Sequence, residues 1–310
     1  MSTLYLHIGT PKTGTSAIQA FLTDNSEYLY SKGLYYPKPD LSFEDILGMD
    51  STSSVIQDCA TGDVTKYRLS AGNASRFAKL KYEYIYGYYA LLCSKPVSEN
   101  KDILLSSEFY WSSIDDKTEY FERISQLPIR IKVIVYLRRQ DEYLSSVVNQ
   151  QVKGLARDFT IKYPDCLKYG IELLGNPNYL EELEKIAGVI GRENIIVRRY
   201  GKGVDVVRDF LDTLNIPLEA GCIMPPKIVN PHLSKSCLWI MQAVNKHVKD
   251  KSRRRAICHF LLDLSVKMNK STEDLFLWSE SVRKEILDKY EESNNRLAKP
   301  YLNEERLFDR

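Results

Sequence analysis

The alternation of apolar and polar residues predicts a series of strands, each followed by a helix, over the first two thirds of the chain. Leu4, Leu6 and Ile8 alternate with less apolar residues, which indicates a strand over residues 3–9. Further strands are predicted at residues 34–36, 103–105, 131–137 and 194–198. Helices are predicted at residues 17–22, 77–93, 116–126, 141–152, 179–190 and 204–214. Such alternation is typical of an α/β fold, in which helices cover both faces of a central parallel sheet.

The pattern changes after residue 215, where helical spacing dominates. The helices predicted there span residues 233–248, 255–268 and 272–290. We interpret them as an extension that packs on the same core. We therefore predict a single domain, residues 1–310, made of an α/β core at 1–215, insertions in that core at 38–76 and 153–177, and a helical extension at 216–310.

Composition and charge narrow the class of protein. Lys and Arg number 43 against 41 Asp and Glu, and a net charge of +2 gives no overall basic field, so we expect no nucleic-acid partner. We see no leader peptide and no apolar run near the roughly 20 residues of a membrane-spanning helix, so we expect a cytoplasmic protein. The four histidines and six cysteines have no metal-ligand spacing, and we expect no metal.

The loop after the first strand has the composition of an anion-binding site. It contains Pro11, Lys12, Thr13, Gly14, Thr15 and Ser16. Unpaired N–H groups at a helix N-terminus attract anions, glycine allows a phosphate to approach the backbone, and hydroxyl and ammonium groups add donors. Gly9 and Gly14 have the GxxxxG spacing of nucleoside triphosphatases, but Lys12 precedes Gly14 instead of following it. We also find no convincing acidic residue at a strand end to hold Mg²⁺.

The segment HIGTPKTGTSAIQAFL resembles the 5′-phosphosulfate-binding loop of sulfotransferases that use 3′-phosphoadenosine 5′-phosphosulfate (PAPS). The resemblance extends in order to about residue 240 and is to members of this family that are like bacterial carbohydrate sulfotransferases. It implies a P-loop-type, three-layer αβα fold, with PAPS as donor and adenosine 3′,5′-bisphosphate (PAP) as product. It further implies that residues 11–16 hold the phosphosulfate and that Lys12 stabilises charge on the leaving phosphate.

PAPS also carries a 3′-phosphate, for which the resemblance implies a second anion site. In the family, a strand ends in Arg and a Ser follows eight residues later inside the next helix. Arg138 and Ser146 have that spacing after the strand at residues 131–137. Arg139 competes with Arg138 for the role, and Gln140 stands where the family often has Pro.

A third family feature is a tyrosine near the nucleotide, at the end of a later strand. Tyr200 follows the strand predicted at residues 194–198 and matches that tyrosine. Gly201 stands where many members have Glu, so the contact of Tyr200 with the nucleotide rests on the tyrosine alone.

Sulfuryl transfer to a hydroxyl needs a base, because the attacking oxygen must lose its proton. Glu108 follows the strand predicted at residues 103–105, at the sheet edge where ligands bind in open parallel sheets. Several carbohydrate sulfotransferases use a Glu base, which supports this assignment. His7, from the first strand, is the rival base, and the sequence leaves both open.

The function predicted from these residues is transfer of a sulfuryl group from PAPS to a hydroxyl of a carbohydrate or polysaccharide. The alternatives are a P-loop kinase that uses ATP and Mg²⁺, and a catalytically silent protein that binds a nucleotide or glycan. The basic run at residues 249–255 leaves three roles open: contact with an acidic glycan, peripheral contact with an anionic membrane, or a solvated turn.

Overall fold

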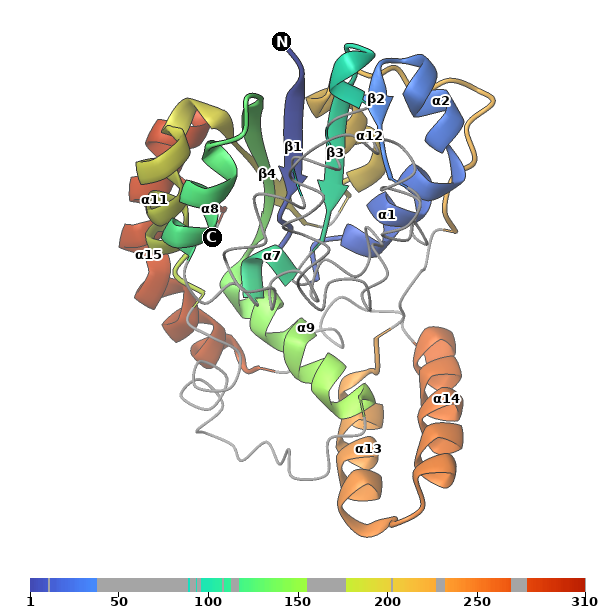
Figure 1. Ribbon diagram of the computed structural model, residues 1–310. Helices are drawn as coiled ribbons and strands as arrows, with labels where there is room; N and C mark the ends of the chain where they lie inside the picture. Colours follow the sequence, from blue (N-terminus) through green and yellow to red (C-terminus); the bar gives the residue numbers. More distant parts are fainter. Residues whose placement is uncertain are drawn as a thin grey trace, which may run out of the picture. The chain divides into compact units, whose positions relative to one another are not determined.

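The computed structural model describes residues 1–10, 12–37, 89, 93, 96–107, 109–112, 117–154, 177–201, 203–226, 232–268 and 278–309 (Figure 1). Contacts divide the chain into two compact units. The sheet unit comprises Met1–Leu137, Tyr179–Pro226 and Arg296–Arg310. The helical unit comprises Arg138–Asn178 and Lys227–Asn295. The single domain that we expect from the sequence, with its core ending at residue 215, stays a prediction.

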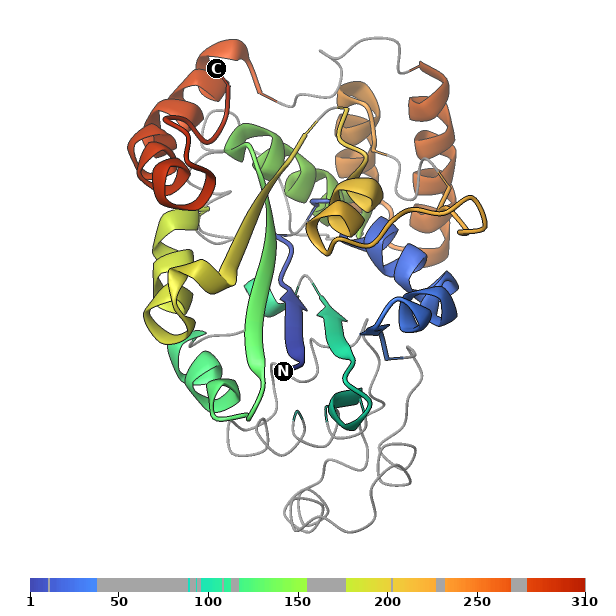
Figure 2. The same ribbon diagram turned by 90° about the horizontal axis from the view of Figure 1, so that it is seen from above.

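A five-stranded sheet forms the centre of the sheet unit. Its strands are β1 (Thr3–His7), β2 (Leu34–Tyr35), β3 (Asp102–Ser106), β4 (Arg130–Arg138) and β5 (Ile195–Tyr200). Their order is β2-β3-β1-β4-β5, and β2–β3, β3–β1 and β1–β4 pair in parallel. Figure 2 shows β4 between β1 and β5. The chain turns to opposite sides of β1, and in such sheets ligands bind at the carboxyl end of the strand where the order reverses.

Helices cover both faces of this sheet because its strands bury side chains on both sides. Leu4, Leu6 and Ile8 pack into one apolar cluster with residues of α8 (Lys117–Ser125) and α11 (Tyr179–Ile190). Ile134 and Tyr136 pack on the other face with residues of α1 (Thr15–Asp24) and α12 (Val206–Thr213). The predicted three-layer α/β fold with a central parallel sheet is confirmed.

The helical unit has its own apolar core. Its helices are α9 (Gln140–Lys153), α13 (Lys235–His247), α14 (Lys251–Met268) and the first part of α15 (Glu280–Leu302). Leu144, Leu238 and Ile286 are fully buried in that core. Figure 1 shows α13 and α14 side by side, joined by a short turn. In the described part of the chain, no helix combines the length and apolarity that crossing a membrane requires.

Most predicted elements appear with small shifts in their bounds, but the last helix, predicted to end at residue 290, continues to Leu302. Three short helices were not predicted: α2 (Ser26–Ser31), α7 (Phe109–Ser112) and the 3₁₀ helix η3 (Arg192–Asn194). The basic run 249–255 is largely helical, since α14 begins at Lys251. Arg254 within it is buried and donates to the carbonyls of Val248 and Lys249 at 2.8 and 2.9 Å, where it closes the end of α13. Most of the predicted helix 77–93 and of both insertions lies outside the described residues.

Candidate functional site

The loop between β1 and α1 requires glycine at position 14. Gly14 caps α1 in the left-handed region, with φ 82°. A Cβ there would lie 2.9 Å from Val206 Cγ1 and 3.0 Å from Tyr200 Cε2, so a side chain meets both strain and a clash. The Tyr200 ring therefore lies against the loop, at the position where the sequence predicts a nucleotide contact.

Gly9 is enclosed by polar atoms. A Cβ on Gly9 would lie 2.6 Å from Thr15 Oγ1, 3.1 Å from His7 Nε2 and 3.3 Å from Thr13 Oγ1. Among the residues that the structure describes, neither Thr15 Oγ1 nor His7 Nε2 has a hydrogen-bond partner, although both are buried. Because buried polar groups are nearly always satisfied, these two atoms mark a place for a water or ligand atom.

Two threonine hydroxyls fix the path of the loop. Thr10 Oγ1 donates to the carbonyl of Tyr136 on β4 at 2.8 Å, and Thr13 Oγ1 donates to the carbonyl of Thr10 at 2.6 Å. Both threonines are fully buried. The hydroxyl proton of Thr13 is thus used inside the loop, whereas Ser16 is exposed to solvent.

Lys12 adopts a backbone conformation that is uncommon for a residue with a side chain. Its φ is 72°, in the left-handed region, and such conformations cluster at ligand-binding sites. Two residues later, the carbonyl of Gly14 accepts from the N–H groups of Ala17 and Ile18 at 2.9 and 3.1 Å, which starts α1. The N–H groups before Ala17 have no acceptor within the helix and form its positive end. Pro11 lies outside the described residues.

His7 is buried and neutral. Its Nδ1 lies 2.7 Å from Ser106 Oγ, and its ring packs against Tyr136 and Phe210. Burial lowers the pKa of His7 to about 3, so the imidazole carries no charge near neutral pH and is a weak base. Glu108, the other candidate base, lies outside the described residues.

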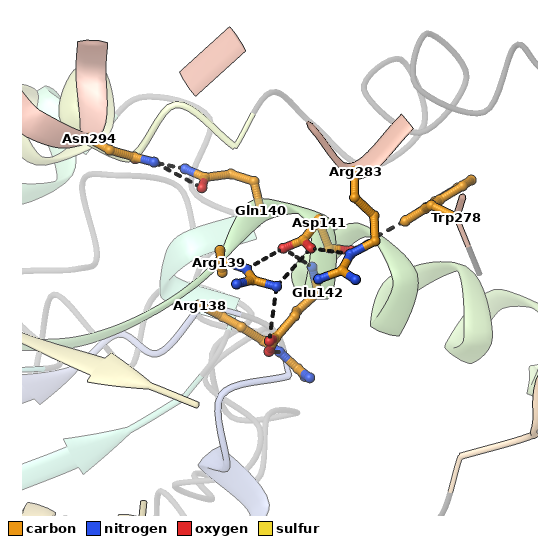
Figure 3. Close-up of polar contacts among 8 residues, drawn as sticks. All are labelled: Arg138, Arg139, Gln140, Asp141, Glu142, Trp278, Arg283 and Asn294. Atoms are coloured by element: carbon orange, nitrogen blue, oxygen red, sulfur yellow. Dashed lines mark hydrogen bonds and ion pairs between the residues drawn. The ribbon is translucent and has the colours of Figure 1, made fainter. Parts of the chain in front are cut away.

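The N-terminus of α9 holds a cluster of charged side chains (Figure 3). Arg139 donates through Nε and Nη2 to both oxygens of Asp141, at 2.8 and 3.0 Å. Arg283 Nε donates to the same carboxylate at 2.8 Å, and Asp141 is 0% exposed. Arg138 instead donates through Nε to Glu142 Oε2 at 3.2 Å. Both arginines thus face Glu142, since Arg139 Nη2 lies 3.8 Å from Glu142 Oε1, and Arg139 in addition binds both oxygens of the buried Asp141.

Ser146, the second predicted ligand of the 3′-phosphate, lies on α9 one turn after Glu142. Its side chain is buried, and Ser146 Oγ has no hydrogen-bond partner within the described ranges. The same holds for Ser145 Oγ. The sequence did not single out Glu142, although residues four apart on a helix share a face, and that spacing links it to Ser146.

Comparisons with known proteins give distant likenesses. No family model matches the chain. An uncharacterised protein of Archaeoglobus fulgidus is 28% identical over 193 residues, which cover 59% of this chain and 49% of that protein, so the chain spans about half the length of this relative. A sulfotransferase from Alicyclobacillus acidocaldarius gives a TM-score of 0.40 at 15% identity, over 82% of this chain and 95% of that one. The sulfotransferase domain from the curacin biosynthetic pathway gives 0.38 at 14% identity, over 93% and 96%. At these values the structural likenesses carry no argument about activity.

Proposed function

We propose that the chain is a sulfotransferase that transfers a sulfuryl group from PAPS to a hydroxyl of a carbohydrate or glycan. The observation that carries this proposal is the shape of the loop between Gly9 and Ser16. Gly14 brings the backbone against Tyr200, and α1 begins with N–H groups that lack acceptors in the helix. Lys12 lies before Gly14 in a left-handed turn, which differs from the lysine position of nucleoside triphosphatases.

We assign the 5′-phosphosulfate to this loop. The N–H groups of the first turn of α1 and the side chains of Thr15 and Ser16 offer donors to its oxygens. Lys12 supplies the positive charge that opposes the negative charge developing on the leaving phosphate. Tyr200, packed on Gly14, would lie beside the bound nucleotide.

We assign the 3′-phosphate to Arg138 and Ser146. The bidentate contact of Arg139 with Asp141 favours Arg138 over Arg139 for this role, because Arg139 is already used in binding a buried carboxylate. The unsatisfied, buried hydroxyl of Ser146 is the kind of group that a phosphate oxygen would complete.

In the proposed reaction, the acceptor oxygen attacks sulfur while the bond between sulfur and the bridging phosphate oxygen breaks. The electron pair of that bond goes to the phosphate oxygen, which leaves as PAP, and the acceptor proton goes to Glu108. We prefer Glu108 to His7 because an imidazole with a pKa of about 3 takes up a proton poorly at neutral pH. The Lys12 ammonium and the loop N–H groups stabilise the transition state.

Thermal unfolding with two nucleotides tests the proposal. A ligand that binds only the folded state adds RT ln(1 + [L]/Kd) to its stability, which is about 2.7 kcal/mol at 100 Kd. We expect PAP to raise the melting temperature at concentrations where ATP with Mg²⁺ does not. A preference for ATP with Mg²⁺ would instead support the kinase alternative.

Transfer itself needs a separate measurement, because a silent binding protein would also pass the first test. PAPS labelled in the sulfuryl group should label at least one member of a panel of neutral and acidic glycans. Binding of PAP without label transfer to any acceptor would point to the silent protein.

A further inference from the structure

Glu142 pairs with the guanidinium group of Arg138, which the 3′-phosphate would also need. Arg138 Nε donates to Glu142 Oε2 at 3.2 Å, and Arg139 Nη2 lies 3.8 Å from Glu142 Oε1. The carboxylate is thus held by two positive charges at the start of α9, as Figure 3 shows. An incoming phosphate that binds Arg138 must compete with this carboxylate.

The two carboxylates of this turn differ in how easily they can be displaced. Asp141 is fully buried and accepts from Arg139, Arg283 and the N–H of Glu142. Removing it would take a shared, bidentate counterion from Arg139 and Arg283 and leave the N–H of Glu142 without this acceptor. Glu142 is 22% exposed and Arg138 18%, so the Glu142 side chain has solvent to move into while its turn of the helix stays in place.

The neighbouring hydroxyl supports an anion at this position. Ser146 follows Glu142 by four residues, so the two side chains share one face of α9. Ser146 Oγ is buried and has no partner in the part of the chain that the structure describes. A phosphate has more oxygens than a carboxylate and can accept from both Arg138 and Ser146.

We propose that Glu142 is an internal substitute for the 3′-phosphate. It holds Arg138 in the empty protein and releases it when a nucleotide with a 3′-phosphate binds. This inference rests on the proposed function and adds a residue that sets nucleotide specificity. A doubly charged phosphate displaces the carboxylate, whereas a nucleotide without that phosphate gains nothing from Arg138.

Glu142→Gln tests this role, because the amide keeps the shape of the side chain and removes its charge. Isothermal titration of the full chain with PAP and with adenosine 5′-monophosphate (AMP) gives the two affinities. We expect Glu142→Gln to bind PAP roughly threefold to tenfold more tightly than wild type, and AMP with unchanged affinity. The unliganded variant should also melt at a slightly lower temperature, since the ion pair between Arg138 and Glu142 is lost. If the ion pair between Arg138 and Glu142 were purely structural, Glu142→Gln would lower stability without any gain in PAP affinity.

Two further variants complete the experiment. Glu119→Gln removes a carboxylate from another helical pair, with Arg123 at 3.7 Å, and should leave both affinities unchanged. In Arg138→Ala the gain from Glu142→Gln should disappear, because Glu142 acts through Arg138. If wild type prefers PAP to AMP but Glu142→Gln binds PAP no better, the role of Glu142 is wrong and the proposed function stands. If wild type shows no preference for PAP over AMP, the assignment of the 3′-phosphate to this chain fails first.

Discussion

Two strand-to-helix junctions, β1 to α1 and β4 to α9, differ in whether acidic side chains lie at the positive end of the helix. The first turn of α1 has no acidic residue, and its cap, Gly14, has no side chain to offer. The first turn of α9 contains Asp141 and Glu142, which bind the adjacent arginines. We call the β1 junction open, because the first turn of α1 has no carboxylate, and the β4 junction neutralised, because its two carboxylates already pair with arginines. Under the proposed function, a ligand would only fill the open junction but would have to displace a side chain at the neutralised one.

The largest effect is expected at the open junction, where Lys12 supplies the positive charge of the loop before α1. Lys12→Ala should lower the rate of PAP release from PAPS by about 10²–10³-fold, the usual cost of losing one donor to a developing negative charge. The assay uses an acceptor identified in the glycan panel. Lys32→Ala, which removes a lysine paired with Glu219 on the surface, should leave the rate unchanged. Equal rates for the two variants would contradict the role of Lys12.

Gly14→Ala should damage the same junction through its backbone. The left-handed φ costs about 1–2 kcal/mol with a Cβ, and the contacts with Val206 and Tyr200 add to it. We expect a loss of about 2–4 kcal/mol in unfolding free energy, together with weaker PAP binding. Gly33→Ala is the matched control, because Gly33 has φ 91° and no described atom lies within 4 Å of its Cβ position. That variant should show the strain alone and normal PAP affinity.

Lowering the pH should lower the unfolding free energy through His7, which lies on β1 beside the open junction. Burial lowers the pKa of His7 to about 3 in the folded state, against 6.5 ordinarily, so below pH 6.5 only the unfolded chain takes up this proton. As the pH is lowered from 6.5 to 3, the contribution of His7 to the unfolding free energy therefore decreases by about 1.4 kcal/mol for each pH unit. Urea unfolding at pH 7 and pH 5 should show a decrease of roughly 2 kcal/mol from this residue. His7→Gln should reduce the decrease by that amount, and an unchanged slope would show that His7 is not buried as a neutral ring.

The smallest effects are expected at the neutralised junction, where alanine variants of the two arginines should differ in stability and in nucleotide preference. Arg139→Ala removes a bidentate partner of Asp141 and should lower the unfolding free energy by about 1–3 kcal/mol, while the preference for PAP over AMP is kept. Arg138→Ala should change stability by about 1 kcal/mol or less, since its pair with Glu142 is partly exposed, but should abolish that preference. The reverse result would transfer the 3′-phosphate to Arg139.

The sequence predicted the layers of the fold well, because periodicity records which side chains are buried. The helix at 179–190 has the predicted bounds, and β4 was recognised from its run of apolar residues. The start of α14 was missed by four residues. Five basic residues in seven resemble a solvated turn, but Asp250 accepts from the N–H of Arg253 at 2.7 Å and starts the helix there.

The candidate site was only partly predictable, for a physical reason. The loop 11–16 is local, so its glycine and hydroxyls could be read directly from neighbouring positions. The choice between Arg138 and Arg139 rests on the contact of Arg139 with Asp141, a carboxylate that is fully buried and also accepts from Arg283. No pattern near residue 138 reveals that burial or the contact with Arg283.

The hydrogen bond from Thr10 to the Tyr136 carbonyl joins residues 126 positions apart in the sequence. Contacts of such long range form slowly, since a large loop must close before they contribute. The loop can take its binding shape only once β4 has paired with β1. During refolding, the ability to bind PAP should therefore return after most of the helical circular-dichroism signal has returned. PAP binding would then report the late step in which the sheet assembles.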